Sequence, residues 1–412
     1  MNPILPAGVF VPDAEARPMP DGRLYIYGSW DVSGNDEYCS RELHCFSTDD
    51  LEHWTDHGVI FRNDEQGAGV SWAKGQPLYA PDAIHRDGKY YLYVCGRGNF
   101  EGVAVADSPV GSFSPAKRIE LADGDGIDPT VLLDDDGQAY LFWGQFCLRG
   151  AKLSDDMCSL VPESITKNIL TEWEHGFHEG ASIRKRDGKY YMLYTDVSRG
   201  RATCLSYAMA DHPLGPYRKC GVVIDNTGCD PASWNNHGSI TEWQGRWYVF
   251  YHRSSQGKQT CRRVCIEPIE FDENGYIREV EQTSQGVSAP MDAYHPIEAR
   301  RACRLKEHSY ITFRGDRELL VSPGRHHWGM PDWAEYKHVD FGDGRATHLT
   351  VRARGHGALT VRADGGEVIA TLALDADEMR SHEAPLCAKV DGVRVVYLFM
   401  DGSMEISDFN FK

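Results

Sequence analysis

The chain has 412 residues, a length that predicts two domains. Its formal net charge is −18 and it has no basic block, which argues against nucleic acid and anionic membranes as partners but not against a neutral ligand such as a sugar. The first ten residues contain no basic segment and no long apolar run, so we expect neither a secretory signal nor a transmembrane helix.

The 12 cysteines are scattered along the chain, and none forms a Cys-x-x-Cys pair. Cys45, Cys95 and Cys204 lie in apolar runs, and Cys261 and Cys265 share one predicted strand. This usage is more typical of buried, reduced thiols in a cytosolic protein than of disulfides or a zinc site. We therefore expect a cytoplasmic location.

A short motif recurs along the first 295 residues: Asp-Gly or Gln-Gly followed by an aromatic-rich apolar run. Glycine accepts a positive φ without steric cost, so each copy predicts a tight hairpin. The copies start at Asp21, Asp87, Asp136, Asp187 and Gln244, with spacings of 66, 49, 51 and 57 residues. A unit of several short strands at this period is typical of a propeller blade. Five copies predict a five-bladed β-propeller.

The repeat pattern ends in a polar stretch from residue 282 to residue 300, which we interpret as a linker. The remainder contains about eight short strand candidates separated by turn residues, a pattern that predicts a β-sandwich. The candidates are 311–313, 334–340, 348–353, 358–363, 368–374, 385–390, 393–400 and 406–411. The predicted fold is therefore all-β, with a propeller over residues 1–295 and an accessory sandwich over residues 296–412.

Titratable side chains precede four of the hairpins at nearly constant spacing. Asp13, Asp128 and Glu179 lie eight residues before an Asp-Gly turn, and His237 lies seven residues before the Gln-Gly turn. The innermost strands of a propeller run along its central channel, so equivalent positions converge there. Each residue alone could belong to an ordinary turn, but the shared register predicts one concave site. Asp82 stands only five residues before its turn, so it could face this site or cap a turn.

Five segments resemble glycoside hydrolase family 43, a family of five-bladed propeller enzymes. They are Val-Pro-Asp13-Ala-Glu-Ala, Ala-Pro-Asp82-Ala-Ile, Ile-Asp128-Pro-Thr-Val-Leu-Leu-Asp-Asp-Asp-Gly, Glu179-Gly-Ala-Ser-Ile-Arg-Lys and Asn-His237-Gly-Ser-Ile. The resemblance implies that Asp13 is the general base, Glu179 the general acid, and Asp128 the pKa modulator that orients the acid. It also implies a calcium or sodium ion held in the channel with the help of His237, and no organic cofactor. The family's usual Ala-Asp-Pro at the base is Pro-Asp-Ala here.

Those roles agree with the chemistry of an inverting glycosidase. One carboxylate deprotonates a water molecule and one carboxylic acid protonates the leaving oxygen, with the two groups about 6.5–9.5 Å apart. Opposed blades of a propeller provide a gap of this kind. We expect Asp13 to be ionised and Asp128 to act on the neighbouring acid by like-charge repulsion.

Sugar recognition needs apolar faces, and four aromatic side chains are candidates near the predicted channel mouth. Packing between blades is the commoner role for any one tryptophan of a propeller. Phe177 is better placed, since it lies two residues before Glu179. The other three candidates are Trp30, Trp72 and Trp143.

Polar substrate contacts are expected from Asp31, Asp82 and one arginine. The segment Cys261-Arg262-Arg263-Val264 resembles the late strand of the family that bears a substrate-facing arginine. Arg262 is our choice, and a different strand register would select Arg263 instead.

The C-terminal part resembles a family 6 carbohydrate-binding module. The resemblance rests on Asp332-Trp333-Ala-Glu-Tyr336-Lys-His-Val-Asp340-Phe and on the closing Ser407-Asp408-Phe409-Asn410-Phe411. Such modules bind sugar between exposed aromatic side chains, and the candidates here are Trp328, Trp333 and Tyr336. Burial in the sandwich explains Trp333 and Tyr336 at least as well, so we expect an accessory domain packed on the propeller.

The combined interpretation is an inverting, exo-acting α-L-arabinofuranosidase that releases terminal pentose from hemicellulose or pectin oligosaccharides. A β-xylosidase is the first alternative, because the family uses one catalytic set for both. A non-catalytic sugar-binding propeller would keep the aromatic residues but lose the acid or the base. A protein-interaction scaffold would lack converging carboxylates. The expected partner is an arabinose- or xylose-containing oligosaccharide.

Overall fold

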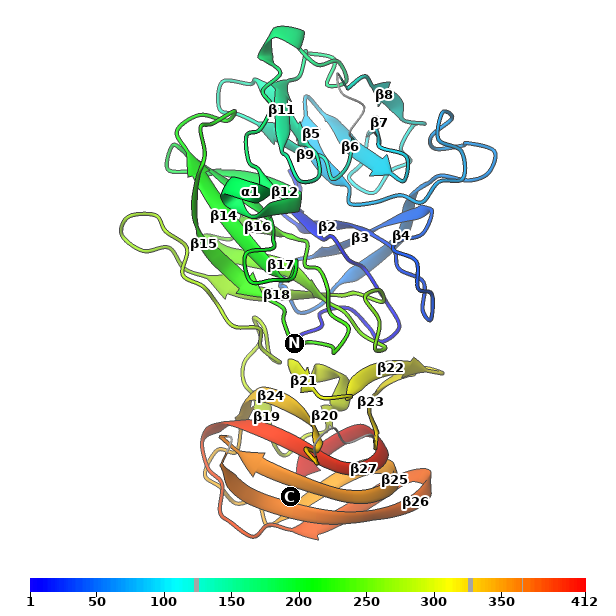
Figure 1. Ribbon diagram of the computed structural model, residues 1–412, viewed down its shortest axis with the longest axis vertical. Helices are drawn as coiled ribbons and strands as arrows, with labels where there is room; N and C mark the ends of the chain where they lie inside the picture. Colours follow the sequence, from blue (N-terminus) through cyan, green and yellow to red (C-terminus); the bar gives the residue numbers. More distant parts are fainter. Residues whose placement is uncertain (122–125, 325–328, 365) are drawn as a thin grey trace.

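The computed structural model describes residues 1–121, 126–324, 329–364 and 366–412. Figure 1 shows two lobes stacked along the longest axis of the molecule. Within the described ranges, the larger lobe consists of five small antiparallel sheets and the smaller lobe of one nine-stranded sheet folded over itself. The prediction of an all-β fold, with a five-bladed propeller followed by a sandwich, is confirmed. The boundary between residues 295 and 296 stays a prediction.

Each blade is formed by strands that are consecutive in the sequence. Blade 1 contains β1 (Glu15–Pro18), β2 (Leu24–Ser29), β3 (Glu42–Thr48) and β4 (Thr55–Arg62). Blade 2 contains β5 (Asp82–Arg86), β6 (Lys89–Gly96), β7 (Phe100–Ala106) and β8 (Lys117–Ile119). Blade 3 contains β9 (Thr130–Leu133), β10 (Ala139–Trp143) and β11 (Arg149–Lys152). Blade 4 contains β12 (Phe177–Arg186), β13 (Lys189–Asp196), β14 (Cys204–Ala210) and β15 (Arg218–Asp225), and blade 5 contains β16 (Ser239–Trp243), β17 (Arg246–Arg253) and β18 (Arg263–Ile269).

The repeated glycine motif forms the turn between the two innermost strands of each blade. In blade 2, Asp87 and Gly88 form a two-residue turn with φ values of 50° and 75°. Asp187 and Gln244 begin the same turn in blades 4 and 5. Two residues with positive φ give a turn whose twist matches that of the flanking strands, which explains why glycine follows at each second position. The turns of blades 1 and 3 are longer.

The ring of blades closes between the N-terminal segment and blade 5. The amide of Ile4 donates to the carbonyl oxygen of Val264 on β18 at 3.1 Å, and the amide of Asn2 donates to the carbonyl oxygen of Ser284 at 2.9 Å. The innermost strands β1, β5, β9, β12 and β16 then contact one another around the channel. Residues distant in sequence therefore meet along one axis.

Helical structure within the described ranges is limited to single turns: η1 (Pro162–Ser164), α1 (Glu172–His175) and η2 (Ala299–Arg301). The α1 turn begins after Thr171, whose side chain accepts a hydrogen bond from the amide of Glu174 at 3.3 Å. It ends at Gly176, with φ 72°, directly before β12. No helix among the described residues has the length and apolarity needed to cross a bilayer. The 12 cysteines are free thiols, and a cytoplasmic location stays a prediction.

The sandwich contains β19 (Met291–Asp292), β20 (Ile297–Glu298), β21 (Arg304–Lys306), β22 (Tyr310–Arg314), β23 (Arg317–Pro323), β24 (Asp332–Asp340), β25 (His348–Ala363), β26 (Glu367–Pro385) and β27 (Val393–Phe411). The predicted separation of 348–353 from 358–363 is wrong, because β25 runs through both. A Cβ on Gly357 would lie 2.1 Å from the carbonyl oxygen of Asp401, so glycine at this crossing lets the long strands stay paired. Residues 386–390 form no strand, although 385–390 was predicted as one.

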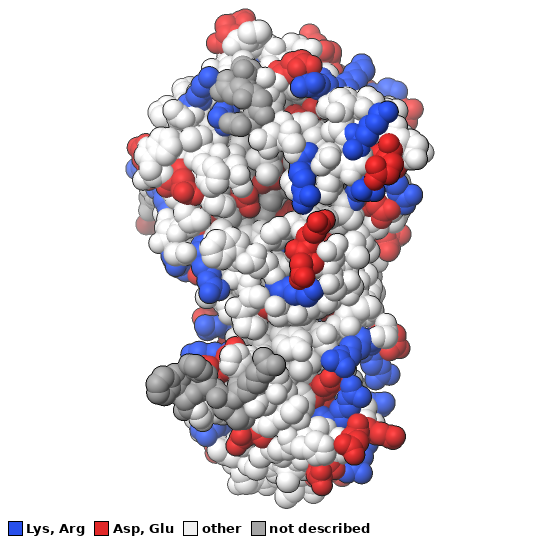
Figure 2. All heavy atoms as spheres, turned by 45° about the vertical axis from the view of Figure 1, so that its right-hand side comes forward, with Lys and Arg blue, Asp and Glu red and all other residues white. Residues whose placement is uncertain are grey.

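The segment predicted as a linker packs closely against blade 5 at its beginning. The amide of Thr283 donates to Oε1 of Glu267 at 2.7 Å, and its hydroxyl donates to Oε2 of the same residue at 2.7 Å. On the face shown in Figure 2, charged side chains of both signs are interspersed, and a waist separates the two lobes.

Candidate active site

A cavity of about 290 Å³ opens at one end of the propeller channel. The four residues selected by their register, Asp13, Asp128, Glu179 and His237, all line it. The other lining residues are Tyr38, Cys39, Tyr79, Ile127, Gln145, His178, Trp234, Asn235, Gln259 and Arg262.

Strand pairing explains why three of these residues meet. Asp13, Asp128 and His237 each lie two residues before an inner-strand residue that pairs at the same height of its hairpin. Asp13 and Asp128 precede their strands with φ values of 58° and 53°, so a left-handed backbone, and not strand alternation, directs their side chains. Glu179 reaches the mouth differently, because β12 has register shifts on both sides of it. A bulge of this kind redirects a side chain.

Asp13 is buried and held from several sides. Its Oδ1 accepts a hydrogen bond from Nη1 of Arg262 at 2.9 Å, and its Oδ2 accepts one from the hydroxyl of Ser29 at 2.8 Å. Nδ1 of His237 and Nδ1 of His252 lie 3.6 and 3.8 Å from Oδ1. Burial opposes ionisation, but Arg262 and the two histidines outweigh it and hold the pKa of Asp13 below its ordinary value. Asp13 is therefore a carboxylate at neutral pH.

Asp128 has the opposite electrostatic environment. Burial, followed by the negative charges of Glu179 and Asp13, raises the pKa of Asp128 well above its ordinary value. Its Oδ2 accepts a hydrogen bond from the amide of Gly180 at 3.1 Å, which fixes it beside Glu179. Glu179 is half-buried and accepts a hydrogen bond from Nε2 of Gln145 at 2.7 Å. The site thus contains an ionised Asp13, an Asp128 whose environment favours its protonated form, and a half-buried Glu179.

His237 lies between the two aspartates, with Nδ1 at 3.6 Å from Oδ1 of Asp13 and 3.9 Å from Oδ2 of Asp128. Burial lowers the pKa of His237 against the opposing carboxylates of Asp13 and Glu179, and Arg262 adds a smaller lowering effect. Gly180, with φ 67°, leaves room for the ring: a Cβ there would lie 2.7 Å from Oγ1 of Thr195 and 3.1 Å from the imidazole.

Arg262 lines the cavity, whereas Asp31 does not. Asp31 was predicted to bind a sugar hydroxyl. Its Oδ2 accepts from Nε of Arg262 at 2.9 Å and its Oδ1 from Nη2 at 3.0 Å, while the amide of Cys39 also donates to Oδ1. The predicted contact of Asp31 with substrate is therefore wrong, because its oxygens hold Arg262 in place. Arg263, the alternative to Arg262, points toward Glu318 of the sandwich.

Asp82 was predicted as a substrate contact and lies outside the cavity. It pairs with Tyr93 at the height where Glu15 pairs with Tyr27, two residues deeper than Asp13. There Asp82 accepts two hydrogen bonds from the guanidinium of Arg17. Asp82 lies five residues before its turn and Asp13 lies eight, so the shorter spacing already indicated a position deeper in the channel. The prediction that Asp82 contacts substrate is therefore corrected.

The deeper layer is a closed polar network. Glu15 accepts hydrogen bonds from Arg184 and from the hydroxyl of Ser182, and Thr130 donates to Asp82 at 3.0 Å. Burial, then the nearby charge of Asp82, raises the pKa of Glu15. Two guanidinium groups and two carboxyl groups thus fill the channel below the cavity, so a sugar can enter from the mouth only.

The four aromatic side chains predicted to contact substrate do not line the cavity. Trp143 and Phe177 are buried in the cores between blades, where Phe177 packs on Tyr194. Trp72 packs against the core between blades 1 and 2. Trp30 stacks on His44 with ring centroids 3.8 Å apart. Packing uses the faces of Phe177, Trp143 and Trp72, so these three predictions are wrong. Trp30 lines a neighbouring cavity of about 640 Å³ that shares Cys39 with the active-site cavity, and its contact with substrate stays a prediction.

Several residues of the cavity wall were not predicted from the sequence. Tyr38 and Gln259 meet across two loops, with the tyrosine hydroxyl donating to Oε1 of Gln259 at 2.9 Å. Tyr38 also lies under the guanidinium of Arg262, at 4.9 Å from its ring centroid. Trp234 remains 45% exposed although it lines the cavity. The loops that contain these residues have no repeat pattern, so the sequence offered no signal for them.

The described residues contain no cluster of side chains that could coordinate the expected channel ion. Among the described residues, no group of three or more histidine, cysteine, aspartate or glutamate side chains could hold a metal. His237 lies near Asp13 and Asp128, and Arg17 and Arg184 add positive charge in the layer below. Calcium takes six to eight oxygen ligands, which include waters, so the channel ion stays a prediction.

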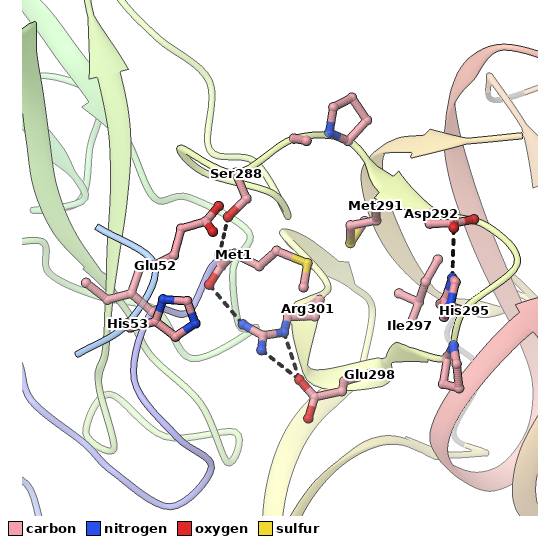
Figure 3. Close-up of a pocket in the computed structure, with 14 residues that line it drawn as sticks. Met1, Glu52, His53, Ser288, Met291, Asp292, His295, Ile297, Glu298 and Arg301 are labelled. Carbon is pink, nitrogen blue, oxygen red and sulfur yellow. Dashed lines mark hydrogen bonds and ion pairs between the residues drawn. The ribbon is translucent and has the colours of Figure 1, made fainter. Parts of the chain in front are cut away.

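A larger cavity, about 600 Å³, lies at the junction of the two lobes (Figure 3). Arg301 bridges there, donating to the carbonyl oxygen of Met1 at 2.9 Å and to Glu298 at 2.9 Å. His295 contacts Asp292 on the sandwich side. None of the four residues selected by register lies in it, so we place the active site at the propeller mouth.

The two aromatic candidates of the sandwich that lie among the described residues, Trp333 and Tyr336, do not form a pair of exposed faces. Tyr336 is fully buried, packs on Phe409 and donates its hydroxyl hydrogen to the carbonyl oxygen of Ala299 at 2.8 Å. Trp333 is half-buried and packs edge-on against Tyr397. Trp328 lies outside the described residues. The likeness to a family 6 module stays a prediction.

Glycoside hydrolysis needs two carboxyl groups in one pit, one ionised and one able to donate a proton. The propeller mouth provides such groups, and this fold and cavity define the class as O-glycosyl hydrolases. The sequence profile of glycosyl hydrolases family 43 matches residues 1–277, and the chain belongs to this family.

Individual relatives agree with this assignment. A xylosidase/arabinosidase of Thermoclostridium stercorarium is 30% identical to this chain, over 98% of this chain and 96% of its own length. A solved family 43 β-xylosidase/α-arabinofuranosidase from a compost microbial metagenome, described as a xylotriose complex in calcium-free form, is 30% identical, covers 68% of this chain and 97% of that chain, and has a TM-score of 0.57. An arabinoxylan arabinofuranohydrolase from Bacillus subtilis, solved with cellotetraose, shares the fold over 100% of this chain and 97% of that chain, with 23% identity and a TM-score of 0.59.

Proposed function

We propose that this chain is an inverting, exo-acting α-L-arabinofuranosidase that removes terminal pentose from hemicellulose or pectin oligosaccharides. The observation that supports it most is the pairing of an ionised, buried Asp13 with a half-buried Glu179 in one closed-bottom cavity. Relatives described as xylosidase/arabinosidase and a neighbour solved with xylotriose support a pentose-containing substrate.

In the proposed mechanism, Asp13 accepts one proton and Glu179 donates another. Asp13 accepts a proton from a water molecule, whose oxygen attacks the anomeric carbon. Glu179 donates its proton to the glycosidic oxygen as the bond to the anomeric carbon breaks, so the leaving sugar departs as an alcohol. Asp128, fixed by the amide of Gly180, orients the acid. Arg262 offers a donor, and the hydroxyl oxygen of Tyr38 an acceptor, for hydroxyl groups of the bound sugar.

The shape of the cavity supports exo action. Its volume of about 290 Å³ is at the small end of the range for ligand pockets, and the network of Glu15, Asp82, Arg17 and Arg184 closes it below. Only a chain end fits such a pocket. Trp234 offers an exposed aromatic face at its wall, where the rest of the oligosaccharide would leave.

Two aryl glycosides test the proposal. We expect turnover of 4-nitrophenyl α-L-arabinofuranoside at a higher kcat/KM than of 4-nitrophenyl β-D-xyloside, and NMR of the first-formed sugar should show the inverted anomer. The reverse preference would make the chain a β-xylosidase, which uses the same carboxyl groups. Inactivity on both, together with sugar binding, would favour a non-catalytic carbohydrate-binding propeller.

A further inference from the structure

One hairpin of the sandwich, formed by β22 and β23, reaches the propeller beside the active site. Figure 1 places β22 at the junction of the two lobes. Two side chains of this strand, Tyr310 and Phe313, contact two separate propeller segments, and the carbonyl group of Ile311 makes a hydrogen bond. Both propeller segments lead directly to residues of the cavity.

The first contact is with the loop that joins β17 to β18. The amide of Gln256 donates to the carbonyl oxygen of Ile311 at 2.6 Å. The adjacent Gly257, with φ 64°, packs on the ring of Tyr310: a Cβ there would lie 3.7 Å from the ring. The carboxylate of Asp230 accepts a hydrogen bond from the amide of Gly257 at 3.1 Å. The sandwich thus holds one end of this loop.

The same loop continues into the cavity wall. Lys258 donates to the carbonyl oxygen of Gly34 at 2.6 Å, and Thr260 donates to the carbonyl oxygen of Asn35 at 2.7 Å. The residue between them, Gln259, lines the cavity and accepts the hydrogen bond from Tyr38 described above. A shift at residues 256–257 therefore moves the wall formed by Gln259 and Tyr38.

The second contact is with the segment that precedes the proposed base. The ring of Phe313 meets the ring of Phe10 edge-on, with centroids 6.3 Å apart. It also covers Gly8, where a Cβ would lie 2.4 Å from the Phe313 ring. The carbonyl oxygen of Phe10 accepts from the amide of Asp31 at 3.0 Å, and Asp13 follows three residues later. Phe313 thus supports the strand entry that leads to Asp13.

We infer that the β22 hairpin positions the sugar-binding wall of the propeller, so that the sandwich contributes to catalysis without touching substrate. Tyr310 and Phe313 are then positioning residues that act through Gln259 and through the segment before Asp13. The solved relative from the compost metagenome matches 68% of this chain with 97% of its own length, so almost all of that chain aligns with the propeller-sized part. In this chain the sandwich supplies the support. The kinetic part of the inference rests on the proposed function.

Phe313→Ala and Tyr310→Ala test the inference in the full chain. Phe399→Ala is the matched control, because Phe399 is a half-buried sandwich phenylalanine whose ring neighbours, Trp333 and Tyr397, belong to the sandwich. We expect the two test variants to raise KM for the aryl glycoside about tenfold or more, with a smaller change in kcat. Phe313→Leu should have a KM close to that of the wild type. A purely structural role would lower the active fraction without changing KM.

Hydrogen exchange provides a readout that does not depend on activity. Amides of residues 256–261 and 31–39 should exchange faster in Phe313→Ala and Tyr310→Ala, but not in Phe399→Ala. Unchanged exchange in both segments would overturn the inference, even if the wild type hydrolysed neither glycoside and the proposed function fell. An active wild type whose test variants matched Phe399→Ala in KM would also overturn it.

Discussion

Nη1 of Arg262 lies 2.9 Å from Oδ1 of Asp13, and Asp31 holds the same guanidinium from its other side. This ion pair joins the two ends of the propeller sequence, because Asp13 precedes β1 and Arg262 precedes β18. It keeps the proposed base ionised in a buried position where it would otherwise favour a proton. One contact thus joins the first and last blades and favours the ionised form of the proposed base.

Arg262→Gln should shift the acid limb of the pH profile. The base must be deprotonated, so activity is lost as pH falls through the pKa of Asp13. Arg262 lowers that pKa against the effect of burial, and its removal should raise it. We expect the acid limb of kcat/KM to move toward neutral pH by about one unit. Arg262→Lys keeps the charge and should move it less; an unmoved limb in Arg262→Gln would contradict the assignment.

Glu179→Gln should reduce kcat on the arabinofuranoside by about a hundredfold or more, the usual scale for general acid catalysis. The loss should be smaller for an aryl group that leaves without protonation, and steady-state kinetics with two leaving groups measures this difference. Glu174→Gln is the matched control: this glutamate is close in sequence, is exposed and does not line the cavity. Turnover like that of the wild type in Glu179→Gln would refute the role.

Trp234→Ala should separate small from large substrates. The exposed indole at the cavity wall can stack on sugar units beyond the bond that is cleaved. We expect KM to rise about tenfold for arabinoxylan oligosaccharides and to change little for the aryl glycoside. Trp173→Ala, which removes a 73% exposed tryptophan that does not line the cavity, is the control. Equal effects on both substrates would contradict a role in chain binding.

Chelation should leave activity and Tm unchanged. Arg17 and Arg184 place positive charge in the channel below His237, and the described residues offer no cluster of metal ligands. Activity and thermal melting are measured after dialysis against EDTA and again after calcium is added. Loss of activity or Tm with EDTA, and recovery with calcium, would contradict this prediction and show that an ion binds in the channel.

Asp82→Asn should lower stability without affecting substrate binding. The change leaves the buried guanidinium of Arg17 with a neutral neighbour in place of its closest carboxylate, and breaking a buried ion pair costs roughly 3–5 kcal/mol. We expect a clear fall in Tm with KM unchanged. Asp87→Asn, at an exposed turn, should alter stability by no more than about 0.5 kcal/mol. A raised KM with unchanged Tm would restore Asp82 as a substrate contact.

The sequence alone determined the repeating hairpins and the register of Asp13, Asp128 and His237. The reason is local: glycine turns fix where each hairpin reverses, and therefore the height at which a residue a set number of positions earlier lies. The shorter spacing of Asp82 from its turn also separates it from the mouth. The propeller and its acidic site therefore follow from nearest-neighbour geometry.

Only the tertiary structure decided which side chains face the sugar. The sequence does not distinguish Phe177 and Trp143 from an exposed aromatic residue, yet packing between blades buries both. Trp234, on a loop, remains exposed. The pairing of Asp31 with Arg262, and the contact of Phe313 with Phe10, join residues more than 200 positions apart. Which side chains are exposed depends on how loops and domains pack around the ring of blades, and no local sequence pattern determines that packing.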